Sequence, residues 1–381
     1  MARTAHTARG AAAVVPAGIR FVGPDGADAV AALRGVLRAL DVADRVEFGG
    51  PGRSRRFGVR IRPEVAAEWA PGFDTLSLAA RLGLDPDRER RDRVVETVVG
   101  LLLAPRTLEF PSFAEFESAV RMRIDTVEAG QRTALAFDTE AIERPEDSWS
   151  YAEPTGFTVR PGRSLVDALV SATQPEASGR RYAFSCYRAS EYVMLIGIAR
   201  EAARSNPAFL ARLQARKERR AVQSGEFHDS FLREYGSMDA PLPLRYHVPG
   251  DRVWFRNPDE RSADAEGYEG SWVIYTGDGR FTNFWIPERP FTLTTKCVEI
   301  HHWRHAAWRD AQGRMRIDEA EVERRVQATL ADPEQTAAVI AQMERPREPR
   351  GVYRDGGCMD TTREFPRFIR PDSCDMVLAE R

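Results

Sequence analysis

Cys186 is the residue whose type and position best suit nucleophilic chemistry. It precedes an apolar stripe of Ala189, Val193 and Ile196, and this spacing predicts a helix that begins at the cysteine. A thiol in the first turn of a helix lies near the positive end of the helix dipole and near free backbone N–H groups, which stabilise the thiolate. The same N–H groups can hold the oxyanion that forms when sulfur attacks a carbonyl. The position indicates a nucleophile, although a buried structural cysteine would give the same pattern.

The bulk composition argues against several other classes of protein. The 381 residues are 43% hydrophobic and 29% charged, as in ordinary globular proteins, and the formal net charge is −2. This balance gives no electrostatic reason to expect nucleic acid or an anionic membrane as a partner. The apolar run at 11–15 is shorter than a signal-peptide core, and those at 94–103 and 192–199 are too short to span a bilayer. We therefore expect a cytoplasmic protein.

The other three cysteines favour the same compartment. Cys297, Cys358 and Cys374 are too few and too scattered, with Cys186, for a disulfide framework or a paired CxxC zinc site. A reducing environment fits this usage best. We expect Cys297 in the core of a strand, and the other two in an irregular tail.

Hydrophobic periodicity indicates how the chain is organised. Ser112 and Glu115 form a capping box that predicts a helix over 112–135, and from Pro249 the pattern changes to strands, with a hairpin at Gly277-Asp278-Gly279 and a longer strand over 291–303. A helix that begins at a cysteine and packs on a later antiparallel sheet is the arrangement of papain-like cysteine enzymes. We predict an α+β fold with such a core. The predicted parts are a flexible arm (1–18), an N-terminal α+β region (19–105), the catalytic core (106–305), and C-terminal helices with an irregular tail (306–381).

Several sequence blocks resemble one known family. They include Thr155-Gly156-Phe157-Thr158-Val159-Arg160-Pro161-Gly162, Tyr182-Ala183-Phe184-Ser185-Cys186 and Pro249-Gly250-Asp251-Arg252-Val253-Trp254-Phe255-Arg256-Asn257-Pro258. In order and spacing they are similar to the single-chain bacterial protein-glutamine gamma-glutamyltransferases of the spore-coat type, which are related to the NlpC/P60 cysteine peptidases. The resemblance covers about 110–287. It implies that Cys186 is the nucleophile, that the core is of the papain-like, NlpC/P60 type, and that neither a metal nor a nucleotide cofactor is needed.

Two positions depart from the family pattern. The family places a catalytic Glu where this chain has Ser271, and a His where this chain has Phe284. Serine is no base near neutral pH and phenylalanine cannot act in proton transfer at all. We expect Ser271, Trp272 and Phe284 to contact substrate instead.

A replacement base is sought in the segment that follows. On a strand, Glu299 and His301 would share one face while His302 points to the other. His301 with Glu299 beside it is therefore the first candidate and His302 the second, although a strand histidine bonded only to its neighbours remains an alternative. His301, His302 and His305 also raise the question of zinc, because histidines at i and i+4 on a helix make a good pair. The expected strand and the lack of a completing carboxylate motif argue against a metal.

Three functions follow from these observations. The first is a cysteine-dependent acyltransferase of transglutaminase type, in which Cys186 forms a thioacyl intermediate from a glutamine side chain, or from a related amide or thioester, and passes it to an amine or to water. Its partners would be a glutamine-bearing protein or peptide, or a small acyl donor, with an amine acceptor. The second is a binding or assembly module on a fold that has lost its chemistry. The third, a peptidase or amidase of the NlpC/P60 type, lacks the strand-start histidine of that family. The oligomeric state is not indicated.

Overall fold

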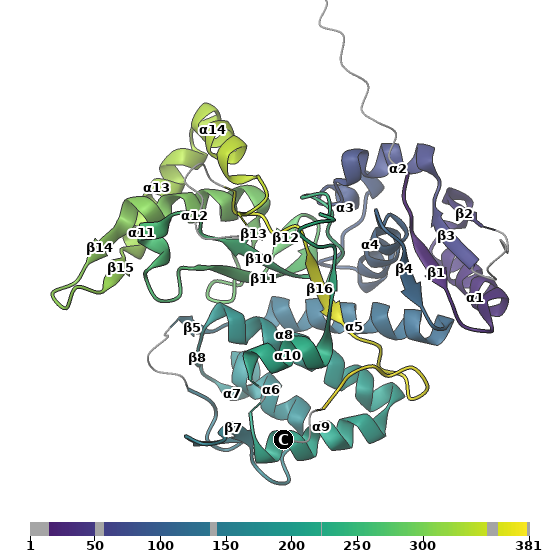
Figure 1. The fold of residues 1–381 in the computed structure, drawn as a ribbon, viewed down its shortest axis with the longest axis horizontal. Coiled ribbons are helices and arrows are strands. Elements are labelled where there is room, and N and C mark those ends of the chain that lie inside the picture. The colour runs from purple at the N-terminus through teal and green to yellow at the C-terminus, as the bar shows by residue number, and fades with distance from the viewer. Residues whose placement is uncertain (1–14, 50–56, 138–142, 222, 349–356, 379–381) are drawn as a thin grey trace, which may run out of the picture.

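The structure is a computed structural model that describes residues 15–49, 57–137, 143–221, 223–348 and 357–378. Most of the predicted arm, residues 1–14, lies outside these ranges. Helices alternate along the chain with strands, which form two main sheets, so the predicted α+β class is confirmed. In Figure 1 the N-terminal sheet lies on one side of the central sheet, the C-terminal helices lie on the other, and α5, α8 and α10 lie along a third. Among the described helices, none is both long and apolar enough to cross a bilayer.

The N-terminal region is a four-stranded sheet with helices packed against it. The strand order is β2-β3-β1-β4, antiparallel except where β1 pairs with β4. The apolar side of α4 is buried with Ile19 and Phe21 of β1 in one core. The elements are β1 (Ile19–Phe21), α1 (Gly26–Ala39), β2 (Val46–Phe48), β3 (Phe57–Ile61), α2 (Pro63–Trp69), α3 (Leu78–Leu82), α4 (Arg90–Leu102) and β4 (Leu108–Phe110).

Two long helices form the centre of the molecule. In α5 (Phe113–Arg132), Ser112 accepts a hydrogen bond from the N–H of Glu115, as the predicted cap requires. α8 (Cys186–Ser205) packs closely along it, because a Cβ at Gly197 would lie 2.4 Å from Thr126 Oγ1. Only glycine permits this approach of the two helices.

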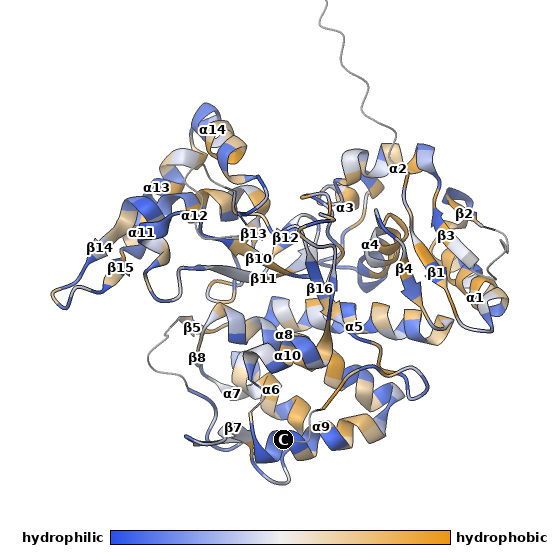
Figure 2. Cartoon of the chain, viewed as in Figure 1, coloured by the Kyte–Doolittle hydropathy of each residue, from blue (hydrophilic) through white to orange (hydrophobic). Residues whose placement is uncertain are grey.

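Smaller elements complete the helical side. Hydrophilic and hydrophobic residues alternate along α9, as expected for a helix with one face in the core (Figure 2). The apolar side of that helix buries Phe209 and Leu213. The elements are β5 (Ala136–Phe137), β6 (Trp149–Ala152), β7 (Gly156–Val159), α6 (Leu165–Thr173), α7 (Pro175–Ser178), β8 (Ala183–Phe184), α9 (Pro207–Arg219) and α10 (Ser224–Phe231).

The central sheet has six strands in the order β13-β12-β11-β10-β16-β9. Its strands are β9 (Leu232–Tyr235), β10 (Arg252–Arg256), β11 (Gly270–Gly277), β12 (Arg280–Phe281), β13 (Phe291–Thr292) and β16 (Arg363–Pro366). The predicted hairpin is present as β11 and β12. β16 comes from the C-terminal tail, which has few periodic signals in its sequence, and it lies between β10 and β9.

The Gly250-Asp251 pair joins this sheet to α5. Gly250 has φ +88° and a Cβ there would lie 2.8 Å from the Cα of Arg123. Asp251 accepts from Arg123 at 2.7 Å and from the N–H of Val248 at 2.7 Å, and both charged side chains are buried. A buried ion pair with these additional bonds fixes the start of β10 against the helix.

The predicted strand over 291–303 is wrong. Only Phe291–Thr292 are extended, as β13, and α12 (Leu293–Ala306) begins directly afterwards. Thr292 and Thr295 cap this helix with reciprocal hydrogen bonds. The many β-branched residues favoured a strand, but packing against the helices that follow decided otherwise. The C-terminal part contains α11 (Glu260–Ala263), β14 (Ala307–Arg309), β15 (Met315–Ile317), α13 (Glu319–Leu330) and α14 (Pro333–Met343).

Candidate active site

Cys186 is the first residue of α8, so the predicted start of this helix is confirmed. Ser185 caps the helix, with its hydroxyl oxygen accepting from the N–H of Arg188 at 3.3 Å. The helix packs against α5 on one side and against β11 of the central sheet on another. A cysteine at a helix tip beside an antiparallel sheet is the arrangement expected for a papain-like core.

The environment of the sulfur does not favour the thiolate as strongly as the helix tip alone suggested. Burial raises the pKa of the Cys186 thiol, and this is the largest effect. The backbone N–H groups of Trp272 and Tyr187, and the charges of Lys296 and Arg252, act in the opposite direction and lower that pKa. The expectation that Cys186 is already a thiolate before it reacts is therefore corrected. Desolvation raises the pKa of the thiol more than the helix terminus lowers it, so the sulfur must lose its proton as it reacts.

Cys186 as a residue is nevertheless partly exposed, and two cavities meet at it. The first has a volume of about 630 Å³ and the second about 680 Å³, and Cys186, Gly267 and Gly270 line both. A reactive residue between two cavities can be approached by two different molecules. A sulfur sealed in the core could not.

The first cavity combines aromatic walls with basic side chains. The rings of Trp254 and Trp272 are stacked, with centroids 5.7 Å apart, and both line it. Lys217 also lines it, and burial lowers the pKa of its amine to about 7, helped by the charge of Arg188. This amine is therefore partly uncharged near neutral pH.

The second cavity contains an ion pair between a buried lysine and a partly exposed glutamate. Lys296, in the first turn of α12, has a side chain only 2% exposed, and its Nζ lies 2.5 Å from Oε2 of Glu299. The ammonium also lies over the ring of Phe291, 3.4 Å from its centroid. The chain has only two lysines, and each lines one of the cavities that reach Cys186.

A second charged network is centred on Arg252, whose charge acts on the Cys186 thiol. The guanidinium of Arg252 lies 3.8 Å from the centroid of the Trp272 ring, and it donates to Ser190 at 2.9 Å and to Glu364 at 2.5 Å. His228 bonds the other oxygen of Glu364 at 2.9 Å. The tail strand β16 thus supplies the carboxylate that holds the Arg252 guanidinium in place.

The structure brings together some of the residues selected from sequence. Ser271 and Glu299 line the second cavity with Cys186, and Trp272 lines the first. Phe284 lines neither: its side chain is 0% exposed and packs in the core with Ala189. The structure thus places Phe284 inside the protein and not on a surface that meets substrate.

The two predicted histidines lie away from the cysteine cavities. His301 and His302 line neither one, and on a helix His301 points about 200° around the axis from Glu299, so the shared strand face does not exist. Burial is the main cause that lowers the pKa of His301 to about 3 and that of His302 to about 4. Groups with such low pKa values are weak bases.

Sequence reasoning missed Lys296 as a site residue. A lysine in a segment expected to be a strand carries no motif of its own. The scarcity of lysine is the one signal in the sequence, and only the fold shows that Lys296 lines a cavity together with Cys186. Arg252 lies in a family block but was not singled out.

These features define an α+β protein with a cysteine thiol at a helix tip between two cavities. The model of the protein-glutamine gamma-glutamyltransferase family matches residues 86–364, beyond both ends of the resemblance noted from sequence, and the chain belongs to this family. The family transfers acyl groups from glutamine-bearing proteins to amines. Among solved structures, a transglutaminase from Geobacillus stearothermophilus without its C-terminal extension is similar, with 18% identity and a TM-score of 0.37, over 55% of this chain and 96% of that chain. No curated protein matches the chain.

Proposed function

We propose that this protein is a transglutaminase-type acyltransferase that forms a thioacyl intermediate on Cys186. The observation that supports this most directly is the position of the thiol at the tip of α8, between two cavities. The acyl donor and the acceptor amine would reach the sulfur from these two sides.

The reaction proceeds in two steps. The sulfur of Cys186 attacks the side-chain amide carbon of glutamine, a C–S bond forms, the C–N bond breaks, and ammonia leaves. An amine then attacks the thioester, a C–N bond forms, and the C–S bond breaks to return the thiol. Water in place of the amine gives glutamate. The backbone N–H groups of Trp272 and Tyr187, which point at the sulfur, are suitably placed to stabilise negative charge in both steps.

Lys296 and Glu299 take over proton handling in this proposal. The family's partner residues are replaced by Ser271 and Phe284, and the second cavity offers a carboxylate and an ammonium in their stead. Glu299 accepts the proton that leaves the thiol and returns it to the departing ammonia, while Lys296 stabilises the transient thiolate. His301 and His302 have no role in this mechanism, because they do not line the cavity.

The test measures ammonia release and amine incorporation on a glutamine-rich protein such as casein. Wild type should release ammonia, and Cys186→Ala should reduce the rate to background. Cys374→Ala is the matched control, because Cys374 is also a partly exposed free thiol but lies outside the site, and it should retain the wild-type rate. Equal rates for wild type and Cys186→Ala reject the proposal.

A second candidate function is a binding module that keeps the fold without chemistry. The raised pKa of Cys186 and the replacement of both family partner residues favour it. Iodoacetamide labelling of Cys186 from pH 6 to 10, read by mass spectrometry of the peptide, separates the two. A thiol that labels no faster than free cysteine at any pH, together with no ammonia release, favours the module. The cytoplasmic location predicted from cysteine usage stays a prediction.

A further inference from the structure

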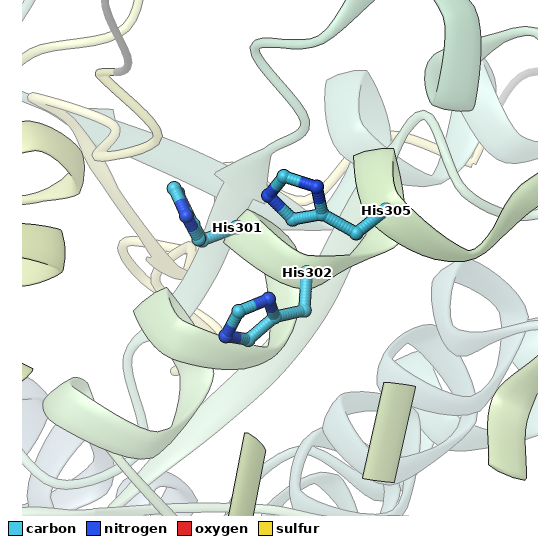
Figure 3. Close-up of side chains that lie close together, drawn as sticks. All are labelled: His301, His302 and His305. Carbon is cyan, nitrogen blue, oxygen red and sulfur yellow. The ribbon is translucent and has the colours of Figure 1, made fainter. Parts of the chain in front are cut away.

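Three histidines gather at the end of α12, on a different side of the helix from the ion pair. His301, His302 and His305 stand at positions i, i+1 and i+4, which on a helix cover an arc of only about 100°. On the strand expected from sequence, neighbours would have pointed to opposite faces. Figure 3 shows the three imidazole rings gathered beside the last turns of this helix.

The distances between the rings are short. The centroids lie 5.0 Å apart for His301 and His302 and 5.5 Å apart for each of these with His305. One nitrogen from each ring lies within 4.8 Å of those of the other two. Zn–N bonds of about 2.1 Å place ligand nitrogens roughly 3.4 Å apart, so small side-chain rotations complete the geometry.

Two buried nitrogens of this cluster lack a partner. Nδ1 of His301 and Nδ1 of His302 are shielded from solvent and have no hydrogen bond within the described residues. A buried polar atom without a partner costs roughly 1–3 kcal/mol. A metal ion between the rings would satisfy both.

Thr329 orients one of the three rings. Its Oγ1 lies 2.8 Å from Nε2 of His302, and the threonine itself is buried on α13. When Nε2 donates to this oxygen, the lone pair of the ring is on Nδ1, the unpartnered atom. Metal-binding histidines are commonly held by such a second hydrogen bond.

The charges around the cluster keep the rings neutral. Burial is the main cause that lowers the pKa of all three histidines, and the charge of Arg304 acts in the same direction on each of them. Arg325 also lowers the pKa of His302 and His305, while Glu321 raises that of His302 and Asp259 that of His305. Neutral imidazole is the form that binds metal. The two arginines reduce the affinity for a cation.

We propose that His301, His302 and His305 bind one divalent transition-metal ion, with water in the remaining coordination positions. A ligand set made only of imidazole selects Zn²⁺, Ni²⁺ or Cu²⁺ over Mg²⁺ and Ca²⁺, which prefer oxygen. His305 is exposed and provides the entry path. The site is independent of the acyl-transfer proposal, although Lys296 and Glu299 lie on the same helix.

The test uses the full chain without a histidine tag, stripped with EDTA. Zn²⁺ is titrated in competition with a chromogenic chelator, and thermal melting is followed with and without Zn²⁺. Wild type should bind one ion per chain and melt at a higher temperature with Zn²⁺, whereas Mg²⁺ should have no effect. His305→Gln should weaken binding at least roughly tenfold and abolish the thermal shift. Because His305 is exposed, this variant should fold.

Two controls assign the binding to the cluster. His228→Gln removes a partly exposed histidine elsewhere, and Cys186→Ala removes the cavity thiol; both should bind Zn²⁺ as wild type does. The proposal is overturned if wild type binds no Zn²⁺, or if His305→Gln binds it equally well.

Discussion

Lys296 holds the carboxylate of Glu299 one helical turn along α12, with Nζ 2.5 Å from Oε2, in the cavity that reaches Cys186. Such a partner offsets the cost of burying the ammonium, whose side chain is 2% exposed, and the ring of Phe291 adds a second favourable contact. The pair thus places a positive charge near a thiol whose pKa is raised by burial, and this charge partly offsets the rise.

Replacing Lys296 by Met should make Cys186 less reactive. The ammonium lowers the thiol pKa, so its loss should raise that pKa. Iodoacetamide labelling at pH 7 and kcat/KM for amine incorporation should therefore each fall, by roughly tenfold. Lys296→Arg keeps the charge and should retain most of the labelling rate. A labelling profile of Lys296→Met that overlays wild type from pH 6 to 10 would show that the charge does not act on the sulfur.

Gly270→Ala should disturb both cavities. A Cβ at this position would lie 2.3 Å from Nε1 of Trp254 and 2.5 Å from the carbonyl oxygen of Phe255, and the second atom is backbone that cannot move easily. We expect a loss of roughly 1–3 kcal/mol in unfolding free energy and little remaining activity. Gly35→Ala is the matched control, because a Cβ on α1 meets nothing within 4 Å and alanine favours the helix. Chemical denaturation of both variants decides, and a Gly270→Ala protein as stable as wild type contradicts the packing argument.

The features recovered from sequence are those with a local cause. The helix at Cys186, the cap at Ser112 and the hairpin at Gly277-Asp278-Gly279 each depend on periodicity or turn chemistry within a few residues, and each is present. The cysteine also lies in a block that resembles its family. Chemistry and local pattern agree at these positions.

The features that were missed depend on distant contacts. α12 was expected as a strand because its composition favours one, and packing against α13 and α14 decides its form. β16 is four residues long and has no pattern of its own; its place beside β10 exists only in the folded chain. Because the segment that contains Lys296 and Glu299 was predicted as a strand, the sequence did not indicate that both side chains line a cavity with Cys186. Glu299 was selected only as a neighbour of His301.

Glu96→Gln should stabilise the protein at neutral and alkaline pH. Burial is the main cause that raises the pKa of Glu96 to about 7, from an ordinary 4.5, despite hydrogen bonds from the N–H of Asp278 and the hydroxyl of Tyr275. The folded state thus holds this proton more tightly than the unfolded chain does, and stability is lost as pH rises from about 4.5 to about 7. The loss amounts to about 3 kcal/mol at most.

The glutamine keeps an acceptor oxygen and carries no charge, so it should remove this pH dependence. The measurement is unfolding by urea at pH 5 and pH 8 for wild type, Glu96→Gln and the exposed-residue control Glu68→Gln. We expect Glu96→Gln to gain relative to wild type only at pH 8. An equal difference at both pH values would mean that the carboxyl does not titrate in this window.

His228→Gln should change stability in the acidic range. The hydrogen bond to Glu364 is the main cause that raises the pKa of His228 above its ordinary value of 6.5. A base with a raised pKa contributes stability that is fully present below the unfolded pKa and is lost as pH rises through the folded one. Wild type should therefore exceed His228→Gln in melting temperature at pH 5.5, and the difference should shrink by pH 9. Asp229→Asn alters an exposed charge on the same helix but keeps the bond to Glu364, and it should follow the wild-type profile closely. If His228→Gln differs from wild type equally at pH 5.5 and 9, the contact between His228 and Glu364 stabilises the protein by packing and not by charge. In that case the charge of the imidazole does not support the ion pair between Glu364 and Arg252.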